Sequence, residues 1–363
     1  MARRRQNAGL ARRRRAIDTL DAGIQKLLTR RAEHAQAIAG VKQGGKDGSV
    51  YRPEREAQIL HKVKARNRGP LRDENLTRIY REIVSSCRAL EQDLSVAFLG
   101  PEGTFTEEAA LKHFGHAVTA LPLAAIDEVF REVESGNAAY GVVPIENSTE
   151  GVINHTLDMF MVSSLKICGE VELPIHHHLL GRRARTRRVK RVVSHQQSLA
   201  QCREWLDANL PGVERVAVSS NAEAARLASR SAGLLAIAGE SAARRYGLTS
   251  LAVNIEDRPD NATRFLVIGR QAAAPSGNDK TTLMLSGRNR PGALSRLLAP
   301  LARRKINMTR IESRPSRASR WEYVFFIDLD GHIKSRKLAL ALADLEKEAA
   351  FMKWLGSYPK AIG

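Results

Sequence analysis

Four polar side chains follow one another where a short apolar run ends, in residues 140–151 (YGVVPIENSTEG). The β-branched run at its start predicts a strand that Pro144 ends, followed by a loop and a helix. Polar side chains at the carboxyl end of a strand in an α/β sheet lie where ligands bind. Glu146, Asn147 and Ser148 are therefore candidate binding residues, although the same pattern is also typical of an ordinary loop with a helix N-cap.

A second polar cluster begins another apolar run much further along the chain. Thr263, Arg264 and Phe265 (TRF) open the run that continues to Ile268. The combination of PIENS, at residues 144–148, with a later TRF resembles the prephenate dehydratase family. The rest of the chain agrees with this resemblance from end to end.

Composition limits the class of protein. A length of 363 residues predicts two or three domains with ample core, and a hydrophobic content of 43% is ordinary for a globular protein. The cysteines (Cys87, Cys168 and Cys202) are odd in number and lack metal-ligand spacing, which favours a reducing compartment. No apolar run approaches the roughly 20 residues that a membrane helix needs, and the arginine-rich start lacks the serines of a transit peptide. We expect a cytoplasmic protein with no membrane partner.

The net charge of +19 is concentrated in two basic clusters. Residues 1–15 contain seven arginines, and residues 182–191 (RRARTRRVKR) contain seven basic side chains. Such blocks often mark arms that bind nucleic acid. No aromatic is interleaved with them and no zinc, helix-turn-helix or RNP signature is evident, so we expect no dedicated nucleic-acid function. A basic surface also steers small dianions toward a site.

Residues 1–92 show helical periodicity. Apolar residues recur at helical spacing over 17–38, glycines at 44–48 interrupt the pattern, and Pro53 begins a second helix. A third helix is expected over 73–92. Three helices, the first of them unusually long, contain too little core for one chain, so we expect an intertwined homodimer or a higher homo-oligomer.

Charged residues of this segment fall on shared helix faces. Arg31 and Lys42 are eleven residues apart and so lie on nearly one face of a helix, at about 100° per residue. Glu91 follows Cys87 by four and ends the apolar stripe of the third helix. Solvated charge at helix ends is the plain alternative, but together these residues indicate a site for an anion.

Residues 1–92 resemble the all-helical chorismate mutase domain. The resemblance implies that Arg14 and Arg31 hold the substrate carboxylates and that Lys42 binds the ether oxygen. Arg55 and Glu56 match a binding arginine and a glutamate at the ring hydroxyl. Arg14 and Arg31 lie 17 residues apart, roughly 25 Å along a helix at 1.5 Å per residue, so Arg14 should come from the other protomer.

The implied mutase chemistry is the Claisen rearrangement of chorismate to prephenate. It needs no nucleophile, only a compact conformer and stabilisation of charge on the ether oxygen, for which Lys42 is one donor. Glu91 stands where several members carry Gln; because a carboxylate would repel the oxyanion, Glu91 should act protonated, its pKa raised by apolar surroundings. Arg52 and Cys87 line the same site but replace an acid and a Ser of some relatives, which leaves the hydroxyl contact mainly to Glu56.

Residues 93–272 alternate between strand and helix patterns. The glycine-rich turn at 100–104 (GPEGT) offers backbone N–H groups to an anion, but it lacks the dinucleotide fingerprint and the Walker lysine. The alternation predicts an α/β fold with a largely parallel sheet. The dehydratase resemblance implies a periplasmic-binding-protein-like fold, in which a second lobe is inserted into the first and the ligand lies in the cleft between them.

The dehydratase resemblance also implies a reaction and a set of residues. Prephenate loses carbon dioxide and its ring hydroxyl to give phenylpyruvate; because hydroxide leaves poorly, a proton donor is essential, and we expect it to be Thr263. Arg264, Asn147 and Ser148 should hold the carboxylates and the carbonyl. No metal or organic cofactor is required. The other residues expected at the cleft are Thr104, Glu146, Ser194 and Gln201.

A run of histidines, His176, His177 and His178, invites a metal-site interpretation. They lie in an apolar run where strand alternation points two side chains one way and one the other. No acid or cysteine stands near them in the sequence, so we expect structural histidines rather than a zinc site.

The end of the chain has the pattern of a small separate domain. Residues 272–280 are a linker by composition, and the βαββαβ order that follows predicts a ferredoxin-like α+β sheet. The segments 290–294 (RPGAL) and 312–315 (ESRP) resemble elements of the phenylalanine-responsive ACT amino-acid-sensing domain. The resemblance implies L-phenylalanine as effector, in contact with Gly292, Ala293, Leu294, Glu312, Ser313, Arg314 and Pro315.

The expected architecture is a multidomain chain: an all-α mutase at 1–92, a two-lobed α/β dehydratase at 93–272 and an α+β ACT domain at 278–363. As a whole it resembles the bifunctional chorismate mutase–prephenate dehydratases of phenylalanine biosynthesis, with inhibition by phenylalanine. Two alternatives stay open. One is an ACT-containing regulator that binds nucleic acid and has degenerate enzyme lobes; the other is a dehydratase that acts on arogenate instead of prephenate.

Overall fold

The computed structural model describes residues 2–43, 51–182, 189–288, 290–316 and 323–362. The side chain of Lys42 and most of the basic cluster at 182–191 lie outside the described part of the chain. Within that part, no helix is both long enough and apolar enough to span a membrane.

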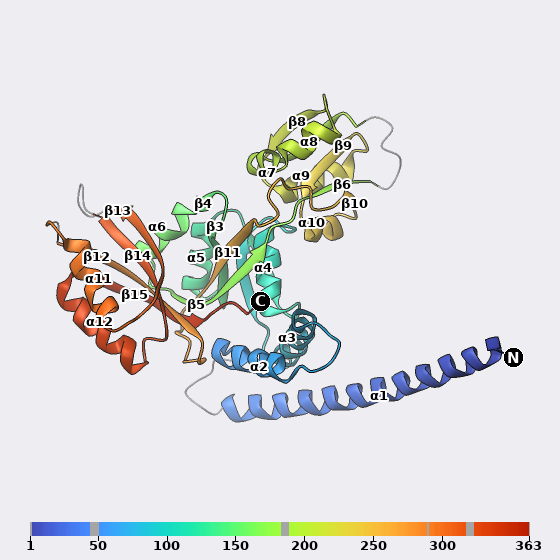
Figure 1. Ribbon diagram of the computed structural model, residues 1–363, viewed down its shortest axis with the longest axis horizontal. Helices are drawn as coiled ribbons and strands as arrows, with labels where there is room; N and C mark the ends of the chain where they lie inside the picture. Colours follow the sequence, from blue (N-terminus) through green and yellow to red (C-terminus); the bar gives the residue numbers. More distant parts are fainter. Residues whose placement is uncertain (1, 44–50, 183–188, 289, 317–322, 363) are drawn as a thin grey trace.

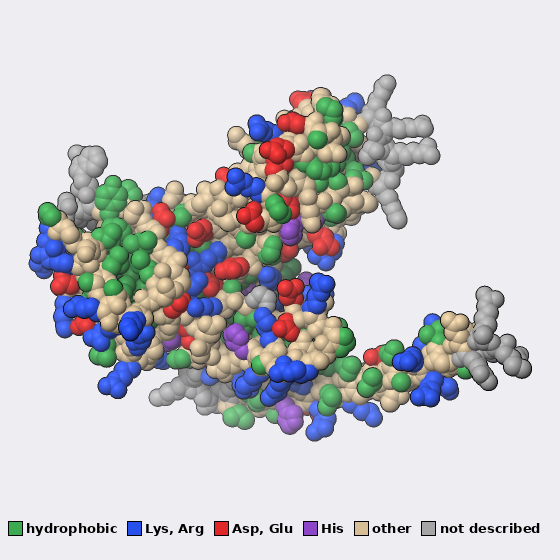
Figure 2. Space-filling view, viewed as in Figure 1, with side chains coloured by type: hydrophobic (Ala, Val, Ile, Leu, Met, Phe, Trp, Pro, Cys, Tyr) green, Lys and Arg blue, Asp and Glu red, His purple; other side chains and the backbone are tan. Residues whose placement is uncertain are grey.

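The N-terminal unit is helical, as predicted. It consists of α1 (Ala2–Gln43), α2 (Pro53–Arg66), which begins with a proline in its first turn, and α3 (Asp73–Ala89), which has acidic residues in its first turn. The N-terminal half of α1 extends well beyond α2 and α3 (Figure 1). Apolar side chains along α1 are open to solvent in the single chain, and Leu20 and Leu27 are 66% and 64% exposed. Hydrophobic and basic side chains both lie along this open helix (Figure 2).

The first α/β lobe contains a mixed sheet with strand order β2-β1-β3-β11-β5, and β4 pairs with β3. Parallel pairing joins β1 to β2 and β3, whereas β11 runs antiparallel to both β3 and β5. The strands are β1 (Ser95–Leu99), β2 (Thr119–Leu123), β3 (Tyr140–Asn147), β4 (Gly151–Val152), β5 (Lys166–Pro174) and β11 (Ala262–Gly269). The helices are α4 (Phe105–Phe114), α5 (Ile126–Ser135) and α6 (Asn154–Val162).

The prediction that Pro144 ends its strand was wrong. β3 runs through Pro144 to Asn147, and its register with β11 shifts between the pairs Arg264–Glu146 and Phe265–Pro144. A proline lacks an N–H to donate, so within a sheet it is tolerated at such an irregularity. The strand therefore carries the polar residues Glu146 and Asn147 on its own last two positions.

The second lobe is inserted between β5 and β11, so the expected two-lobed α/β arrangement is confirmed (Figure 1). Its sheet has the order β10-β6-β9-β7-β8, with parallel pairing of β7 to β8 and β9. The strands are β6 (His178–Gly181), β7 (Arg191–His195), β8 (Glu214–Val218), β9 (Leu234–Ala238) and β10 (Thr249–Ala252). The helices are α7 (Gln196–Gln201), α8 (Arg203–Asn209), α9 (Asn221–Arg230) and α10 (Glu240–Arg245).

The C-terminal domain is the predicted ferredoxin-like βαββαβ unit. An antiparallel sheet of order β13-β14-β12-β15 is covered by helices on one face. The strands are β12 (Asp279–Gly287), β13 (Met308–Pro315), β14 (Tyr323–Asp330) and β15 (Ala349–Pro359), and the helices are α11 (Ala293–Arg303) and α12 (Arg336–Glu348).

The other face of this sheet packs on the first lobe. Met284, Phe326 and Tyr358 belong to the same hydrophobic core as Leu266 and the helices α5 and α6. The approach is closest at Gly356, where an added Cβ would overlap the carbonyl oxygen of Ile167 in β5. On the opposite face of the first-lobe sheet, α4 and the helical unit share a second core. The first-lobe sheet therefore lies between the helical unit and the C-terminal domain.

Candidate active sites

A cavity of about 610 Å³ opens between α1, α2 and α3 and gathers charged side chains from all three helices. Arginines therefore converge from all three helices beside carboxylates such as that of Glu56, which is the arrangement expected for an anionic substrate. Arg14 does not reach it, because it lies on the exposed N-terminal half of α1. Of the residues predicted for the mutase site, those lining the cavity are Arg31, Arg52, Arg55, Glu56, Cys87 and Glu91.

The buried cation Arg88 also lines this cavity and was missed from the sequence. It is 4% exposed and forms an ion pair with Glu56. Its Nη2 donates to the carbonyl oxygen of Phe114 in α4 over 2.6 Å, so one side chain joins the helical unit to the first lobe. Burial raises the pKa of Glu56, and the charge and hydrogen bond of Arg88 oppose that rise.

At the cleft between the α/β lobes, the polar ends of β3 and β11 lie side by side. Asn147 and Thr263 are partners in the strand register, and Asn147 Nδ2 donates to Thr263 Oγ1 over 2.8 Å. The same Nδ2 donates to Asn261 Oδ1 over 3.0 Å. Thr263 accepts in this contact, so its own O–H can be directed at a ligand. Thr263 is 8% exposed, and Asn261, a residue that sequence reasoning missed, is 3% exposed.

Asn261 also lines a cleft pocket of about 260 Å³ together with residues of the second lobe. Gln201 lies on the other side of this pocket, and its Oε1 accepts from Asn261 Nδ2 over 3.2 Å. Ser148 is held next to the pair, since its Oγ accepts from the backbone N–H of Ala262 over 2.9 Å. The predicted residues Asn147, Ser148, Gln201 and Thr263 are thus brought together at one place.

Glu146 and Arg264 point away from this cleft, which does not fit their expected role as substrate ligands. Successive side chains of a strand face opposite sides of the sheet, so the neighbours of Asn147 and Thr263 face the C-terminal domain. Glu146 pairs with Arg310 of β13 over 2.9 Å. Arg264 Nη1 donates to Asp328 of β14 over 2.6 Å.

The hydroxyl groups of Ser194 and Thr104 form hydrogen bonds within the protein. Ser194 is fully buried and donates to the carbonyl oxygen of Ile237 over 2.7 Å. Thr104 is the N-cap of α4, where its Oγ1 accepts from the N–H of Glu107 over 3.4 Å. Both positions shape the lobes that form the cleft, and neither presents its hydroxyl to the cleft pocket described above.

The histidine run holds the segment that precedes Asn261. His176 Nδ1 lies 2.8 Å from Glu256 Oε1, and His178 Nδ1 accepts from the N–H of Asn254 over 3.1 Å. His177 Nε2 lies 2.9 Å from Gln201 Oε1, and burial lowers the pKa of His177. Among the described residues, no group of three or more His, Cys, Asp or Glu side chains is placed to hold a metal ion.

The segments expected to bind an effector lie on the C-terminal domain. Gly292 is the N-cap of α11 with φ 74°, a left-handed conformation that favours glycine, and Ala293 and Leu294 begin the helix. The segment 312–315 lies on β13, an edge strand of the sheet. Arg314 donates to Asp158 of α6 over 2.7 Å, so one expected effector residue contacts the first lobe instead.

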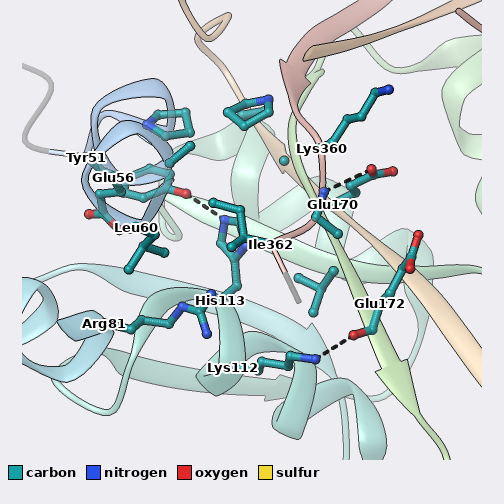
Figure 3. Close-up of a pocket in the computed structure, with 17 residues that line it drawn as sticks. Tyr51, Glu56, Leu60, Arg81, Lys112, His113, Glu170, Glu172, Lys360 and Ile362 are labelled. Carbon is teal, nitrogen blue, oxygen red and sulfur yellow. Dashed lines mark hydrogen bonds between the residues drawn. The ribbon is translucent and has the colours of Figure 1, made fainter. Parts of the chain in front are cut away.

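A smaller cavity of about 90 Å³ lies where α2, α4, β5 and residues 359–362 meet (Figure 3). Tyr51 Oη lies 2.6 Å from His113 Nε2, and burial lowers the pKa of His113 to about 3. Glu170 accepts from the N–H of Ala361 over 3.1 Å. Glu56 lines both this junction cavity and the larger helical one.

A helical anion pocket, a two-lobed α/β cleft and a ferredoxin-like sensor sheet define a multidomain enzyme with a regulatory domain. Family models match in the same order: Chorismate mutase type II at residues 13–92, Prephenate dehydratase at 96–273 and ACT domain at 281–347. The chain belongs to the family of bifunctional chorismate mutase/prephenate dehydratases, and it carries both enzyme activities, which serve phenylalanine biosynthesis.

Relatives of similar length carry the whole arrangement. The bifunctional chorismate mutase/prephenate dehydratase of Stutzerimonas stutzeri is 56% identical over 351 residues, which cover 95% of this chain and 96% of that protein. The enzyme of the same description from Pseudomonas aeruginosa is 55% identical with the same coverage. A solved prephenate dehydratase from Arthrobacter aurescens, in complex with L-Phe, is 38% identical with a TM-score of 0.68 and covers 74% of this chain and 90% of its own.

Proposed function

We propose that the helical pocket converts chorismate to prephenate and that the cleft between the α/β lobes converts prephenate to phenylpyruvate. The observation that supports this most directly is the single cavity that gathers Arg31, Arg55, Glu56 and Glu91. The experiment follows chorismate consumption and phenylpyruvate formation by the purified chain. Prephenate and arogenate are compared as substrates of the second step. Domain limits of 1–92, 93–272 and 278–363 are part of the same proposal.

In the mutase step, the arginines hold the two carboxylates of a compact chorismate conformer. No bond to the protein forms, so the rate depends on orientation and on donors aimed at the ether oxygen. Lys42 and Glu91 are the two donors, and Glu56 accepts from the ring hydroxyl. Arg52 and Cys87 complete the wall of the pocket. Arg14 is supplied by a second protomer.

In the dehydratase step, Thr263 transfers its proton to the ring hydroxyl as that group leaves. The electron pair of the breaking bond to the carboxylate moves into the ring, and the products are carbon dioxide, water and phenylpyruvate. Solvent water then returns a proton to the Thr263 oxygen, which releases hydroxide and restores the donor. Asn147 and Asn261 orient Thr263, while Ser148 and Gln201 contact the substrate. Arg203 and Arg258 line the cleft pocket, and they take the carboxylate-binding role first expected of Arg264.

Phenylalanine acts as the feedback inhibitor of the dehydratase in this proposal. The backbone N–H groups at the start of α11 suit a carboxylate, and helix N-termini attract anions. The solved relative in complex with L-Phe supports the choice of effector. Gly292, Ala293 and Leu294 form one side of the site, and the segment 312–315 of a neighbouring protomer forms the other.

We also infer that the chain forms a homodimer or a higher homo-oligomer in the cytoplasm. A second copy would cover the open apolar stripe of α1, which includes Leu20 and Leu27. The three cysteines are free and buried, which agrees with a reducing compartment. Light scattering of the purified protein measures the assembly, and Leu20→Lys together with Leu27→Lys should yield monomers without mutase activity.

A further inference from the structure

Two ion pairs join the ends of β3 and β11, which carry Asn147 and Thr263, to the sheet of the ACT domain. Asn147 and Thr263 face the cleft, and the residues next to them, Glu146 and Arg264, face the other side. Glu146 pairs with Arg310 of β13, and Arg264 pairs with Asp328 of β14. Each cleft residue is therefore one peptide bond from a side chain that is held by the regulatory domain.

The contacts of Arg264 fix its guanidinium in both position and orientation. Its Nε donates to Glu170 Oε2 over 2.8 Å, its Nη1 donates to Asp328 Oδ2 over 2.6 Å, and its Nη2 donates to Tyr358 Oη over 3.1 Å. Asp328 and Tyr358 belong to the ACT domain, whereas Glu170 belongs to β5. The planar guanidinium of arginine has several N–H donors in fixed directions, so it restricts the orientation of its partners more than a lysine ammonium would.

The cluster around Arg264 is buried and balanced in charge. Glu170 and Asp328 are 4% and 2% exposed, and a second cation, Lys280, donates to Glu170 Oε2 over 2.7 Å. Thr282 Oγ1 donates to Asp328 Oδ1 over 2.6 Å, which satisfies the other oxygen of that carboxylate. Removing one partner from such a cluster leaves a charge without compensation, so the cluster resists sliding of the two sheets against each other.

The ion pair between Glu146 and Arg310 is a second connection to the ACT domain, from β3 instead of β11. Arg310 has a side chain that is 10% exposed and lies on β13, two residues before the segment 312–315. That segment is the one proposed to contact the effector. A displacement of β13 would therefore move Glu146 through its ion pair with Arg310. The movement of Glu146 would in turn change the hydrogen bond between Asn147 and Thr263.

We propose that Arg264 and Glu146 are positioning residues, which hold Thr263 and Asn147 in reactive geometry from the ACT sheet and carry the effector signal to them. The proposal deepens the dehydratase function proposed above and rests on Thr263 as the proton donor. Neither positioning residue touches the substrate. A reacting group that shifts by about 1 Å can lose on the order of 100-fold in rate, so small sheet movements suffice.

The test uses the full chain with substitutions in the ACT domain, because no side chain of that domain is proposed to contact the substrate. Asp328→Asn keeps the shape but removes the charge facing Arg264, and Arg310→Gln independently breaks the tie to Glu146. Each should lower the dehydratase kcat by about 10-fold or more, with KM changed less than about 2-fold. Each should also weaken inhibition by phenylalanine. Mutase turnover, measured in the same sample, should stay at the wild-type rate.

The matched control is Asp158→Asn, which breaks another ion pair between the same two domains. Asp158 pairs with Arg314 over 2.7 Å but stands on α6, and so it is not a neighbour in sequence of Asn147 or Thr263. Its dehydratase kcat should stay within about 2-fold of wild type. An equal loss of kcat in this control would mean that any weakening of the interface has the same effect, and would overturn the proposal.

Two further results separate this inference from the assignment of Thr263. Wild-type kcat in both Asp328→Asn and Arg310→Gln would overturn the positioning role, whatever Thr263→Ala does. Normal kcat in Thr263→Ala would overturn the proton-donor assignment, whatever the ACT-side variants do. A rise in KM alone on Arg264→Lys would identify Arg264 as a substrate ligand and contradict the proposal.

Discussion

Glu56 of α2 and Arg88 of α3 form a buried ion pair in the wall of the mutase pocket, and Arg88 also donates to the carbonyl oxygen of Phe114 in the dehydratase. The mutase site is therefore anchored on the neighbouring enzyme domain through one guanidinium. Because burial raises the pKa of the half-buried Glu56 and Arg88 lowers it, the state of this carboxyl depends on Arg88.

Arg88→Gln should make mutase activity more sensitive to acid. Burial raises the pKa of Glu56 and Arg88 lowers it, so removal of Arg88 leaves the rise less opposed. The Glu56 carboxylate, which accepts from the ring hydroxyl in the proposal, is then protonated at a higher pH than in the wild type. Arg81 and Arg31 also face Glu56 and remain in the variant. The measurement is the mutase pH–rate profile; an acid limb at the wild-type position would exclude this role for Arg88.

Glu91→Gln should preserve mutase activity. In the proposal, Glu91 is a hydrogen-bond donor to the ether oxygen, and the amide of Gln can donate in its place. The mutase rate is measured with the dehydratase rate of the same sample as control. Loss of mutase activity in the variant would remove Glu91 from the mechanism as a donor.

His113→Phe should make the stability of the folded protein less dependent on pH in the acidic range. Burial holds the pKa of His113 at about 3, whereas the unfolded chain has the ordinary value near 6.5. The unfolded state binds the proton first, so stability decreases as pH falls below about 6.5 toward 3. The variant lacks this contribution of His113 but also loses the hydrogen bond between His113 and the Tyr51 hydroxyl, which costs about 0.5–1.5 kcal/mol at neutral pH. Tm measured from pH 7 to pH 4 tests both effects; parallel curves for the two proteins would contradict them.

Glu312→Ala should weaken inhibition of the dehydratase by phenylalanine. A hydrogen bond to a charged partner contributes about 1.5–3 kcal/mol, so the concentration for half inhibition should rise about 10-fold or more. Calorimetric titration of phenylalanine gives the matching change in affinity. If the wild type shows neither binding heat nor inhibition at millimolar phenylalanine, the regulatory role fails while both enzyme assignments stand.

The motifs could indicate the candidate sites because they are local features of the chain. PIENS and TRF end up on neighbouring strands, with Asn147 opposite Thr263, and Arg31, Arg55 and Glu56, which were expected from the resemblance to the mutase domain, line one cavity. What sequence reasoning missed depends on contacts between domains. The acceptor of Arg88 is a backbone carbonyl of another domain, and Asn261 lies in a segment without periodicity.

Arg264 shows why we propose a role for it that differs from the one expected from its motif. Strand alternation places Thr263 and Arg264 on opposite faces of the sheet, and this was predictable from the period of two. What could not be read from the sequence is that the ACT sheet covers the second face and supplies Asp328 and Tyr358. The motif therefore led to the expectation of a substrate ligand, whereas the contacts of Arg264 support the positioning role proposed above.

The most direct test of the two-site account is a time course of chorismate supplied to purified Thr263→Ala. The account predicts that chorismate is consumed at the wild-type rate, that prephenate accumulates and that phenylpyruvate does not form beyond the uncatalysed rate. The mutase pocket is untouched and only the proton donor of the cleft is lost. Formation of phenylpyruvate at near the wild-type rate would contradict the assignment of the dehydratase site, and failure to consume chorismate would contradict the independence of the two sites.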